Sequence, residues 1–387
     1  MDIQITPGPL SGSVTPPPSK SQSHRLLIAA SLAGERSYVR RLADSKDIEA
    51  TRRCMDAMLS PVDLPLMDCG ESGSTLRFLI PLALVLRGGG RFTGHGRLME
   101  RPQGPYEDLF RSQGNYWNLE NGVLTVEGNL SPGVISLPGN VSSQFITGLL
   151  FALPFLDEDS EIRLTTALES RDYVDMTLEV LHKFAIRADW IDDRTLWVGG
   201  NQRYAPAQVT AEADWSQAAF WYAANFLDSA LQIEGLNFGS SQGDKSVLDF
   251  ATQLAQPGDV TLDLADYPDL VPPLAVMAAT RSGTARFVNI ARLRLKESDR
   301  IATTAALVNA LGGQAQEEAE ALVLHGVPAL TGGTVDGAND HRIVMAAAIA
   351  ATRCQAPVTI LGAQAVSKSY PTFFEEFQRL GGMYHVL

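Results

Sequence analysis

The apolar residues of this chain gather in runs of two kinds, and the difference predicts two kinds of helix. Runs such as LLIAASLA from residue 26, FITGLLFAL from residue 145 and RIVMAAAIAA from residue 342 are apolar on nearly every side of a helix. Such a helix is normally buried in a core, whereas the amphipathic runs that follow are typical of helices that cover one. Short β-type runs lie between them, and strands that alternate with helices favour an α/β class.

This succession recurs along the chain and predicts a repeated unit. Each copy holds an apolar helix, a turn of small residues, a short strand, a polar loop and a second helix. The copies begin at Ala29, Leu82, Phe151, Tyr222, Met277 and Ile349. Six similar segments in order are a signature of internal repetition, and they divide naturally into three and three. We therefore expect two domains with a boundary near residue 210.

Composition narrows the class of protein. The 387 residues are 45% hydrophobic and 19% charged, with a net charge of −13, which disfavours nucleic acid and anionic membranes as partners. Three cysteines without CxxC spacing and six histidines without i,i+4 pairing give no support to disulfides or a metal site. The acidic N-terminus does not resemble a signal peptide, so a cytoplasmic location is expected.

Basic residues stand where helices are predicted to begin. Serine, aspartate and asparagine at these positions are explained by helix capping. Lysine and arginine are not, because they meet the positive end of the helix dipole unless an anion lies between them. The residues concerned are Lys20, Arg25, Arg101, Lys296, Arg300, Arg342 and Lys368. If the repeats turn these helix ends toward one space, the acidic chain gains a cationic pocket for a multiply anionic ligand.

Several motifs resemble those of the 5-enolpyruvylshikimate-3-phosphate (EPSP) synthase family, in the same order, from about residue 3 to residue 375. They are PSKSQSHR, GESGSTLR, GHGRLMERPQGP, VSSQF, SRDYVDMT, QGD, YPDLVPPLAV, RLRLKESDR, NDHRIVMA and SKSYPTFF. The resemblance implies the enolpyruvyl transferase fold, an inside-out α/β barrel with two domains. Each domain has three α/β units around a pseudo-threefold axis. It also implies that residues 1–18 join residues 212–387, that residues 19–211 form the other domain, and that the active site lies in the cleft between domains.

The activity implied by the resemblance is transfer of the enolpyruvyl group of phosphoenolpyruvate to the 5-hydroxyl of shikimate 3-phosphate, with release of phosphate. This is a step of the shikimate pathway toward chorismate and the aromatic amino acids. The family needs no metal and no organic cofactor, because protein cations neutralise the anionic substrates. We also expect a monomer.

Addition followed by elimination requires one carboxylic acid and one carboxylate in the same site. By motif match, Glu297 is the expected acid and Asp269 the expected base, and either Lys20 or Lys296 shares in the proton transfer. Read without the resemblance, Glu297 is equally well a surface ion-pair partner of Arg300, three positions later.

The resemblance also assigns the substrate contacts. The residues expected to bind shikimate 3-phosphate are Ser21, Arg25, Ser142, Ser143, Gln144, Ser170, Tyr173, Asp269 and Lys296. Those expected to bind phosphoenolpyruvate are Lys20, Gly73, Arg101, Gln144, Arg300, His341, Arg342 and Lys368. A helix cap is the alternative for each serine taken alone, and a packing role is the alternative for His341.

The sequence departs from the family pattern at three places. The first unit appears shortened near residues 60–69, where the family inserts a β-hairpin. Glu71 and Arg292 stand where asparagine is common. Glu71 places a carboxylate near the expected phosphoenolpyruvate site, where it either weakens binding or pairs with a cation.

Two alternatives stay open at this point. One is the related enzyme that transfers enolpyruvyl to UDP-N-acetylglucosamine, although neither Cys54 nor Cys69 lies in a loop matching its reactive cysteine. The other is a non-catalytic anion-binding protein on the same scaffold. A dinucleotide site at RGGGRFTGHG is rejected, because its glycines follow a helix rather than a strand.

Overall fold

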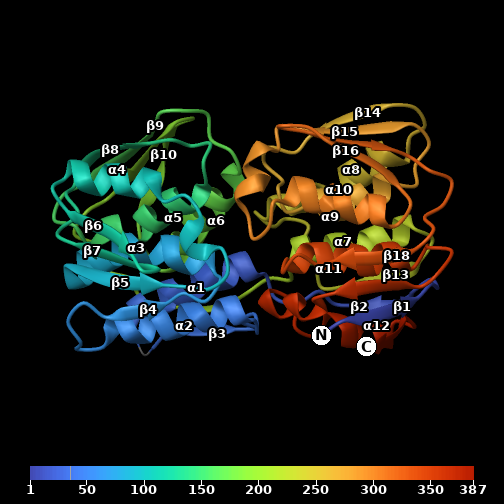
Figure 1. The fold of residues 1–387 in the computed structure, drawn as a ribbon. Helices are drawn as coiled ribbons and strands as arrows, with labels where there is room; N and C mark the ends of the chain where they lie inside the picture. The colour runs from blue at the N-terminus through green and yellow to red at the C-terminus, as the bar shows by residue number, and fades with distance from the viewer. Residues whose placement is uncertain (35) are drawn as a thin grey trace. The chain divides into compact units, whose positions relative to one another are not determined.

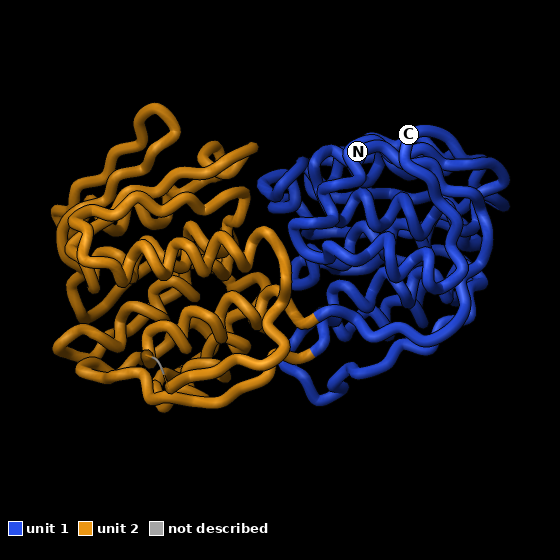
Figure 2. Tube along the Cα trace, turned by 90° about the horizontal axis from the view of Figure 1, so that it is seen from below, with its two compact units in different colours: residues 1–17, 213–387 blue, residues 18–212 orange. Residues whose placement is uncertain are grey.

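The computed structural model describes residues 1–34 and 36–387, and the chain divides into two compact units (Figure 2). Unit 1 combines residues 1–17 with residues 213–387, and unit 2 holds residues 18–212. The chain therefore passes between the units twice. Near these passages, Asp214 donates its backbone N–H to the carbonyl of Pro17 at 2.9 Å within unit 1, and Ser19 donates to Glu212 at 2.7 Å within unit 2.

Unit 2 contains six α-helices and ten strands among its described residues. The helices are α1 (Lys20–Ala33), α2 (Lys46–Leu59), α3 (Gly73–Arg87), α4 (Gly104–Ser112), α5 (Ser143–Ala152) and α6 (Arg171–Lys183), with 3₁₀ turns η1 (Leu98–Glu100) and η2 (Leu153–Phe155). The strands are β3 (Tyr38–Arg40), β4 (Leu66–Asp68), β5 (Gly89–Thr93), β6 (Tyr116–Glu120), β7 (Val123–Glu127), β8 (Gly133–Leu137), β9 (Ser160–Leu164), β10 (Ala188–Asp192), β11 (Thr195–Val198) and β12 (Gln208–Thr210).

Unit 1 repeats the same kinds of element. Its helices are α7 (Trp215–Phe226), α8 (Val247–Ala255), α9 (Val271–Ala278), α10 (Arg300–Ala310), α11 (His341–Ala351) and α12 (Phe373–Arg379), with 3₁₀ turns η3 (Gly243–Ser246), η4 (Ala291–Leu295) and η5 (Ala363–Lys368). Its strands are β1 (Ile3–Thr6), β2 (Ser11–Val14), β13 (Ala230–Ile233), β14 (Val260–Asp263), β15 (Thr284–Val288), β16 (Gln314–Glu317), β17 (Leu322–His325), β18 (Gly333–Asp336), β19 (Val358–Leu361) and β20 (Met383–Val386).

Four of the six sheets share one topology. Their strand orders are β4-β5-β7-β6, β8-β9-β11-β10, β14-β15-β17-β16 and β18-β19-β1-β20. In each, the first two strands are parallel and the other pairings are antiparallel. A buried helix connects each parallel pair, as a parallel crossover requires. The predicted repeated α/β unit is therefore confirmed in the described chain.

The other two sheets consist of a parallel pair alone, β3 with β12 and β2 with β13. In unit 2, residues 60–65 join α2 to β4 without forming a strand. This is the stretch where the sequence lacks the residues for a hairpin, so the β3–β12 sheet has no antiparallel half.

The helices that the sequence marks as apolar on all sides lie inside the sheets (Figure 1). In unit 1, α7, α9 and α11 contact one another, and every residue of α11 is buried. In unit 2, α3 packs against α5, and nine residues of α5 are buried. Each unit has its own hydrophobic core built around these helices.

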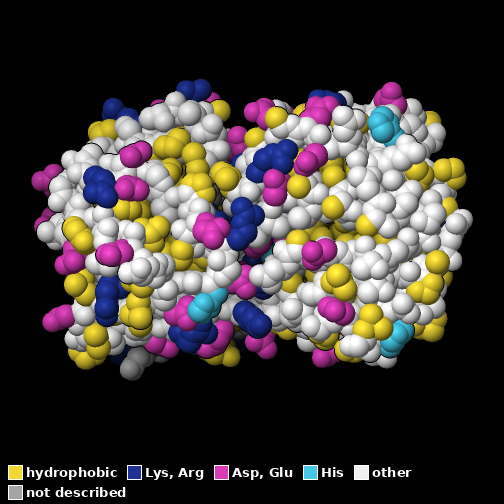
Figure 3. Space-filling model, viewed as in Figure 1, with side chains coloured by type: hydrophobic (Ala, Val, Ile, Leu, Met, Phe, Trp, Pro, Cys, Tyr) yellow, Lys and Arg dark blue, Asp and Glu magenta, His cyan; other side chains and the backbone are white. Residues whose placement is uncertain are grey.

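Capping explains where the buried helices begin. The side chains of Ser19, Ser72, Ser142, Asp214 and Asp340 each accept a hydrogen bond from an amide of the first turn. Such caps satisfy amides that a buried helix end would otherwise leave without partners. Within residues 1–34 and 36–387, no helix combines the length and apolar character needed to cross a membrane. On the face drawn in Figure 3, acidic and basic side chains are interspersed.

Candidate active site

Arg300 is the centre of the ionic cluster in unit 1. It is the first residue of α10, it is 1% exposed, and its guanidinium contacts three carboxylates. Nη1 lies 2.7 Å from Asp269, Nη2 lies 2.7 Å from Glu297, and Nε lies 2.8 Å from Asp340. Because a buried charge is tolerated only when it is paired, these contacts fix the position of the guanidinium.

Asp269, the expected base, bridges two arginines. Its second oxygen lies 2.7 Å from Nη2 of Arg342, which follows the capping Asp340 at the start of α11. Burial alone would raise the pKa of Asp269, but the guanidinium groups of Arg342 and Arg300 hold that pKa well below its usual range. Asp269 is therefore an ionised carboxylate in this arrangement.

Two further groups near Asp269 have shifted pKa values. Burial lowers the pKa of Lys296 to about 7, helped by the nearby Arg292 and Arg300 and opposed by the charge of Asp269. Burial raises the pKa of Asp244 to about 7, and the charge of Asp269 adds to this shift. Asp244 accepts a hydrogen bond from the Ser216 hydroxyl. Groups with pKa values near neutrality cluster at sites of proton transfer more often than elsewhere.

Lys368 and His341 lie beside the same helix start. Nζ of Lys368 donates to the carbonyl of Asn339 at 2.6 Å, so this lysine is tied to the residue before the α11 cap. His341 is 1% exposed, and its Nδ1 lies 3.9 Å from Asp340. Both side chains thus lie at the start of α11, next to the ion-pair network of unit 1. That network consists of Asp269, Glu297, Arg300 and Arg342.

In unit 2, Lys20 is the first residue of α1, directly after the Ser19 cap. Its Nζ lies 2.9 Å from Asp47 at the start of α2, and both side chains are mostly buried. His24, one turn later, has its pKa lowered by burial and by the charges of Lys20 and Arg25. The positive charge in the first turns of α1 therefore comes from Lys20 and Arg25. His24 is neutral and adds none.

Arg25 joins α1 to α6 and is 2% exposed. Its Nε donates to Thr177 at 2.8 Å, and its Nη groups donate to the carbonyls of Ser21 at 2.7 Å and Tyr173 at 2.9 Å. The guanidinium also lies 5.1 Å from the centre of the Phe78 ring. Burial lowers its pKa to about 10, so it remains charged at neutral pH. Arg25 is therefore part of the core of unit 2 and not the surface residue that a lone arginine usually is.

The serines expected to contact shikimate 3-phosphate have different local roles. Ser142 caps α5 through a 3.3 Å bond from the amide of Gln144, so the capping reading holds for it. Ser143 is the buried first residue of that helix. Ser170 precedes α6 in the left-handed conformation, with φ of 58°, and its side chain makes no capping bond. Non-glycine residues held there are strained and concentrate at functional sites.

Gln144 is held from both sides of its amide. Its Oε1 accepts from Nη1 of Arg77 at 2.7 Å, and its Nε2 donates to Ser74 at 2.9 Å. Nη2 of Arg77 donates to the carbonyl of Pro102 at 2.9 Å. Arg77 thereby connects Gln144 to the segment that carries Arg101.

Arg101 lies against Gly73, the first residue of α3. A methyl group added at Gly73 would lie 2.6 Å from Nη1 of Arg101, which is closer than atoms can approach. Nearby, Glu71 extends to the turn at Gly96, where an added Cβ would lie 2.8 Å from its Oε2. Gly73 thus leaves the space that the Arg101 guanidinium occupies.

The cations predicted to lie at or near helix starts occupy two kinds of position. Lys20, Arg300 and Arg342 lie in the first turns of α-helices. Arg25 lies in the second turn of α1. Arg101, Lys296 and Lys368 lie a few residues before α4, α10 and α12, each at the C-terminal end of the short turn η1, η4 or η5. At these three positions a cation meets the negative end of a short helix, so the dipole argument for an anion does not apply there.

Four residues that contact or lie near the expected site residues were not identified from the sequence. They are Asp47, Arg77, Asp244 and Asp340. Arg77 had a readable signal, because a charged residue inside an otherwise apolar helix must be buried with partners. Within the described ranges, no group of three or more His, Cys, Asp or Glu residues is placed to hold a metal ion.

The fold matches solved structures of one class of enzyme. An EPSP synthase from Acinetobacter baumannii superposes with a TM-score of 0.81 at 21% identity, covering 100% of both chains. The enolpyruvyl transferase NikO from Streptomyces tendae superposes with a TM-score of 0.79 at 16% identity, covering 99% of this chain and 98% of its own. The fold is therefore that of the enolpyruvyl transferases.

Sequence comparison identifies the family within this class. The profile of EPSP synthase (3-phosphoshikimate 1-carboxyvinyltransferase) matches residues 5–377. The 3-phosphoshikimate 1-carboxyvinyltransferase of Clostridium kluyveri is 41% identical over 98% of this chain and 97% of its own. That of Clostridium acetobutylicum is 40% identical over 99% and 98%. The chain belongs to the EPSP synthase family, which confirms the resemblance seen in its motifs.

Proposed function

We propose that Glu297 and Asp269 move the protons in the transfer of the enolpyruvyl group of phosphoenolpyruvate to the 5-hydroxyl of shikimate 3-phosphate, with release of phosphate. The reaction is that of the family to which the chain belongs. The observation that carries the assignment of residues is the network around Arg300, in which one buried guanidinium contacts both Asp269 and Glu297. An acid candidate and a base candidate thus share one fixed partner.

In the proposed addition step, a proton is delivered to the methylene carbon of phosphoenolpyruvate while the 5-hydroxyl attacks C2 and loses its own proton. Glu297 is the donor of the first proton, and Asp269 is the acceptor of the second. In the elimination step, the methyl carbon loses a proton and the C–O bond to phosphate breaks, which restores the double bond and releases phosphate.

The ion pairs of Arg300 tune these two carboxyl groups. An anionic substrate that takes part of the Arg300 fork weakens the hold of the guanidinium on Glu297 and Asp269. A carboxyl group that loses a nearby positive charge binds its proton more tightly. Substrate binding therefore favours protonated Glu297 as a donor and makes Asp269 a stronger base. Lys296, with its pKa of about 7, is placed beside Asp269 to take part in the same proton transfer.

The two substrates use different sets of contacts in this proposal. Arg101, Arg300, Arg342 and Lys368 hold phosphoenolpyruvate, with Lys20 between the two ligands, and Gly73 and His341 complete the set. The α1, α5 and α6 starts hold shikimate 3-phosphate through Ser21, Arg25, Ser142, Ser143, Gln144, Ser170 and Tyr173. Arginine suits these anions because its planar fork binds a carboxylate or phosphate at two points. A monomeric, cytoplasmic protein remains our prediction.

Release of inorganic phosphate from the two substrates tests the proposal. We expect turnover by the wild type, and loss of nearly all of it in Lys20→Ala and in Glu297→Gln. Lys183→Ala is a matched control in unit 2, because Lys183 pairs with Glu179 on the surface. Turnover with UDP-N-acetylglucosamine in place of shikimate 3-phosphate would contradict the substrate, and full activity of both variants would contradict the residue roles.

A further inference from the structure

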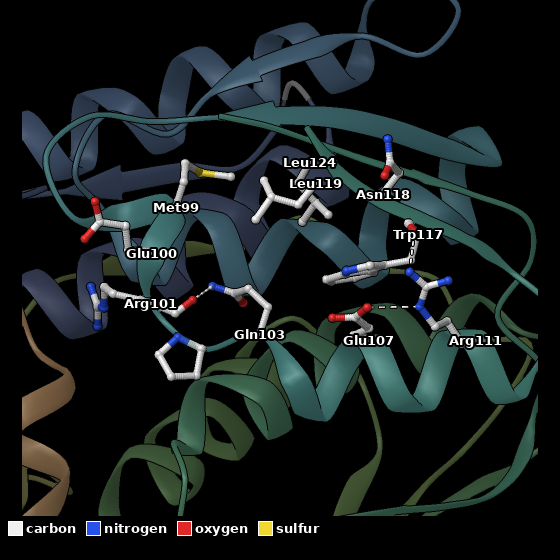
Figure 4. Close-up of a pocket in the computed structure, with 11 residues that line it drawn as sticks. Met99, Glu100, Arg101, Gln103, Glu107, Arg111, Trp117, Asn118, Leu119 and Leu124 are labelled. Carbon is white, nitrogen blue, oxygen red and sulfur yellow. Dashed lines mark hydrogen bonds and ion pairs between the residues drawn. The ribbon is translucent and has the colours of Figure 1, made fainter. Parts of the chain in front are cut away.

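Unit 2 contains a cavity of about 400 Å³ between the segment 99–111 and the hairpin of β6 and β7 (Figure 4). Its volume falls within the range of sites that hold small organic molecules. Residues 99–103 line one end, and Arg101 belongs to this segment although its side chain points away from the cavity (Figure 4). The backbone of residues 99–103 therefore separates the cavity from the Arg101 guanidinium of the proposed substrate site, and none of the side chains that line the cavity reaches both.

One part of the lining is apolar. Met99, Leu119 and Leu124 face the cavity from η1, β6 and β7, with Trp117 beside them (Figure 4). Leu124 is 1% exposed and Leu119 is 49% exposed, so this wall runs from the core to the surface. Such a wall suits a sizeable hydrocarbon or aromatic group.

The charged residues of the lining are Glu100, Arg101, Glu107 and Arg111, and the last two form an ion pair. Nε of Arg111 lies 3.0 Å from Oε1 of Glu107, one turn earlier on α4. Nη2 of Arg111 also donates to the backbone carbonyl of Trp117 at 2.7 Å, which ties the guanidinium to β6. The pair carries no net charge, so the cavity does not favour an inorganic anion or a simple cation.

A donor and an acceptor accompany these charges. Trp117 is 4% exposed, and its indole ring carries an N–H donor at the cavity. Oε1 of Gln103 is buried and has no hydrogen-bond partner within the described part of the chain. Buried polar groups are normally paired, and unpaired ones that line a cavity point to a ligand or water that pairs with them.

We propose that this cavity binds an α-amino acid with a large apolar side chain. Arg111 and the Trp117 N–H receive its carboxylate, and Glu107 and Oε1 of Gln103 receive its ammonium group. The apolar wall receives its side chain. A zwitterion matches this lining because Arg111, Glu107 and the unpaired Oε1 of Gln103 then each have a complementary partner.

Binding there acts on the proposed phosphoenolpyruvate site through Gln103. Nε2 of Gln103 donates to the carbonyl of Arg101 at 3.3 Å. A ligand that engages Gln103 therefore shifts the segment that sets the position of the Arg101 guanidinium against Gly73. This second part rests on the proposed function, whereas binding itself does not.

Titration calorimetry of the full chain with L-phenylalanine tests the site. We expect saturable binding, weakened roughly ten-fold or more for 2-phenylethylamine, which lacks the carboxylate, and for 3-phenylpropanoate, which lacks the ammonium group. Arg111→Gln and Glu107→Gln should weaken binding of L-phenylalanine to a similar degree. Arg163→Gln is the matched control and should not weaken binding. Arg163 pairs with Glu161 on the surface, away from the cavity, and its side chain is exposed to nearly the same extent as that of Arg111 (55% against 54%).

Absence of saturable binding up to about 10 mM, or equal binding by the two analogues and by Arg111→Gln, would overturn the site. A dissociation constant above about 10 mM would be too weak to indicate a specific site. The coupling is tested separately by the KM for phosphoenolpyruvate, which should change with L-phenylalanine in the wild type and not in Glu107→Gln. Because calorimetry needs no turnover, failure of the proposed function would leave the binding result intact.

Discussion

Oε2 of Glu297 lies 2.7 Å from Nη2 of Arg300, three positions later in the chain. Arg300 is 1% exposed, so this contact is part of a buried network and not a surface ion pair of marginal strength. The same guanidinium binds Asp269 and Asp340. The two carboxyl groups that we assign to proton transfer therefore respond together to any change at Arg300.

Glu297→Gln should lower kcat by about 10²- to 10⁴-fold with a smaller change in KM, because the amide fills the same space but delivers no proton. The matched control is Glu318→Gln, since Glu318 also pairs with an arginine in unit 1 but its side chain is more exposed than that of Glu297 (37% against 18%). Steady-state phosphate release at saturating substrates gives the comparison. A Glu297→Gln enzyme within three-fold of wild type would rule out the acid role.

Arg300→Lys should destabilise the protein by about 3–5 kcal/mol, because a lysine cannot contact three carboxylates at once and leaves the fully buried Asp340 without its ion-pair partner. Arg286→Lys is the control, since Arg286 pairs with Glu318 at the surface, where such a change costs about 1 kcal/mol or less. Urea unfolding measures both. Equal effects of the two substitutions would show that the network does not stabilise the fold.

The pH dependence of kcat/KM for shikimate 3-phosphate should report Lys296. Its pKa is lowered to about 7, so the lysine is charged below that pH and neutral above it. Binding of an anion to the charged form predicts that kcat/KM falls as the pH rises through about 7. In Lys296→Arg the charge persists and this limb should disappear, while the titration of the substrate itself is unchanged. An identical limb in both enzymes would assign it to another group.

Asp244→Asn should change how stability depends on pH. Because the pKa of Asp244 is raised to about 7, the folded protein keeps this proton between about pH 4 and 7, while the unfolded chain loses it. Stability from this group is therefore fully present at low pH and is lost as the pH rises, by about 1.4 kcal/mol per unit.

Between pH 5 and 7 the wild type should accordingly lose about 2–3 kcal/mol that Asp244→Asn does not lose. Urea unfolding at the two pH values measures this difference, with Asp249→Asn as an exposed control. Parallel pH dependence in wild type and Asp244→Asn would mean that Asp244 is already ionised at pH 5 and that its pKa is not raised.

Gly73→Ala should raise the KM for phosphoenolpyruvate several-fold, because the added methyl group would lie 2.6 Å from Nη1 of Arg101 and must displace the guanidinium. A shift of about 1 Å in a substrate-positioning group is enough for an effect of this kind. Gly104→Ala is the control, since no atom lies within 4 Å of an added Cβ there. An unchanged KM in Gly73→Ala would mean that Arg101 does not bind this substrate.

The sequence predicted the parts of this architecture that depend on local pattern. Helices such as α11 are apolar on every side, and their caps, including Ser142 and Asp340, are readable from neighbouring residues. The partners of the cations were not predictable in this way. Lys20 and Asp47 lie 27 positions apart, and Asp269 and Arg342 lie 73 apart, so only the packing of the helices brings them together.

The 3₁₀ turns before three helices were not predicted. Arg101, Lys296 and Lys368 end such turns a few residues before α4, α10 and α12, and a turn this short has no sequence period that reveals it. Arg77 is the opposite case, because a charged residue inside an apolar helix predicts a buried side chain with partners.

The backbone bonds between Pro17 and Asp214 and between Ser19 and Glu212 have a practical consequence for dissecting the molecule. The polypeptide leaves unit 1 and returns to it at adjacent points, so residues 18–212 form a nested insert whose two ends meet. Excising that insert would leave a gap that a short peptide joint can close. Each half can then be produced, isotopically labelled and titrated as a separate polypeptide, and mixing the two tests whether activity is restored without a covalent link.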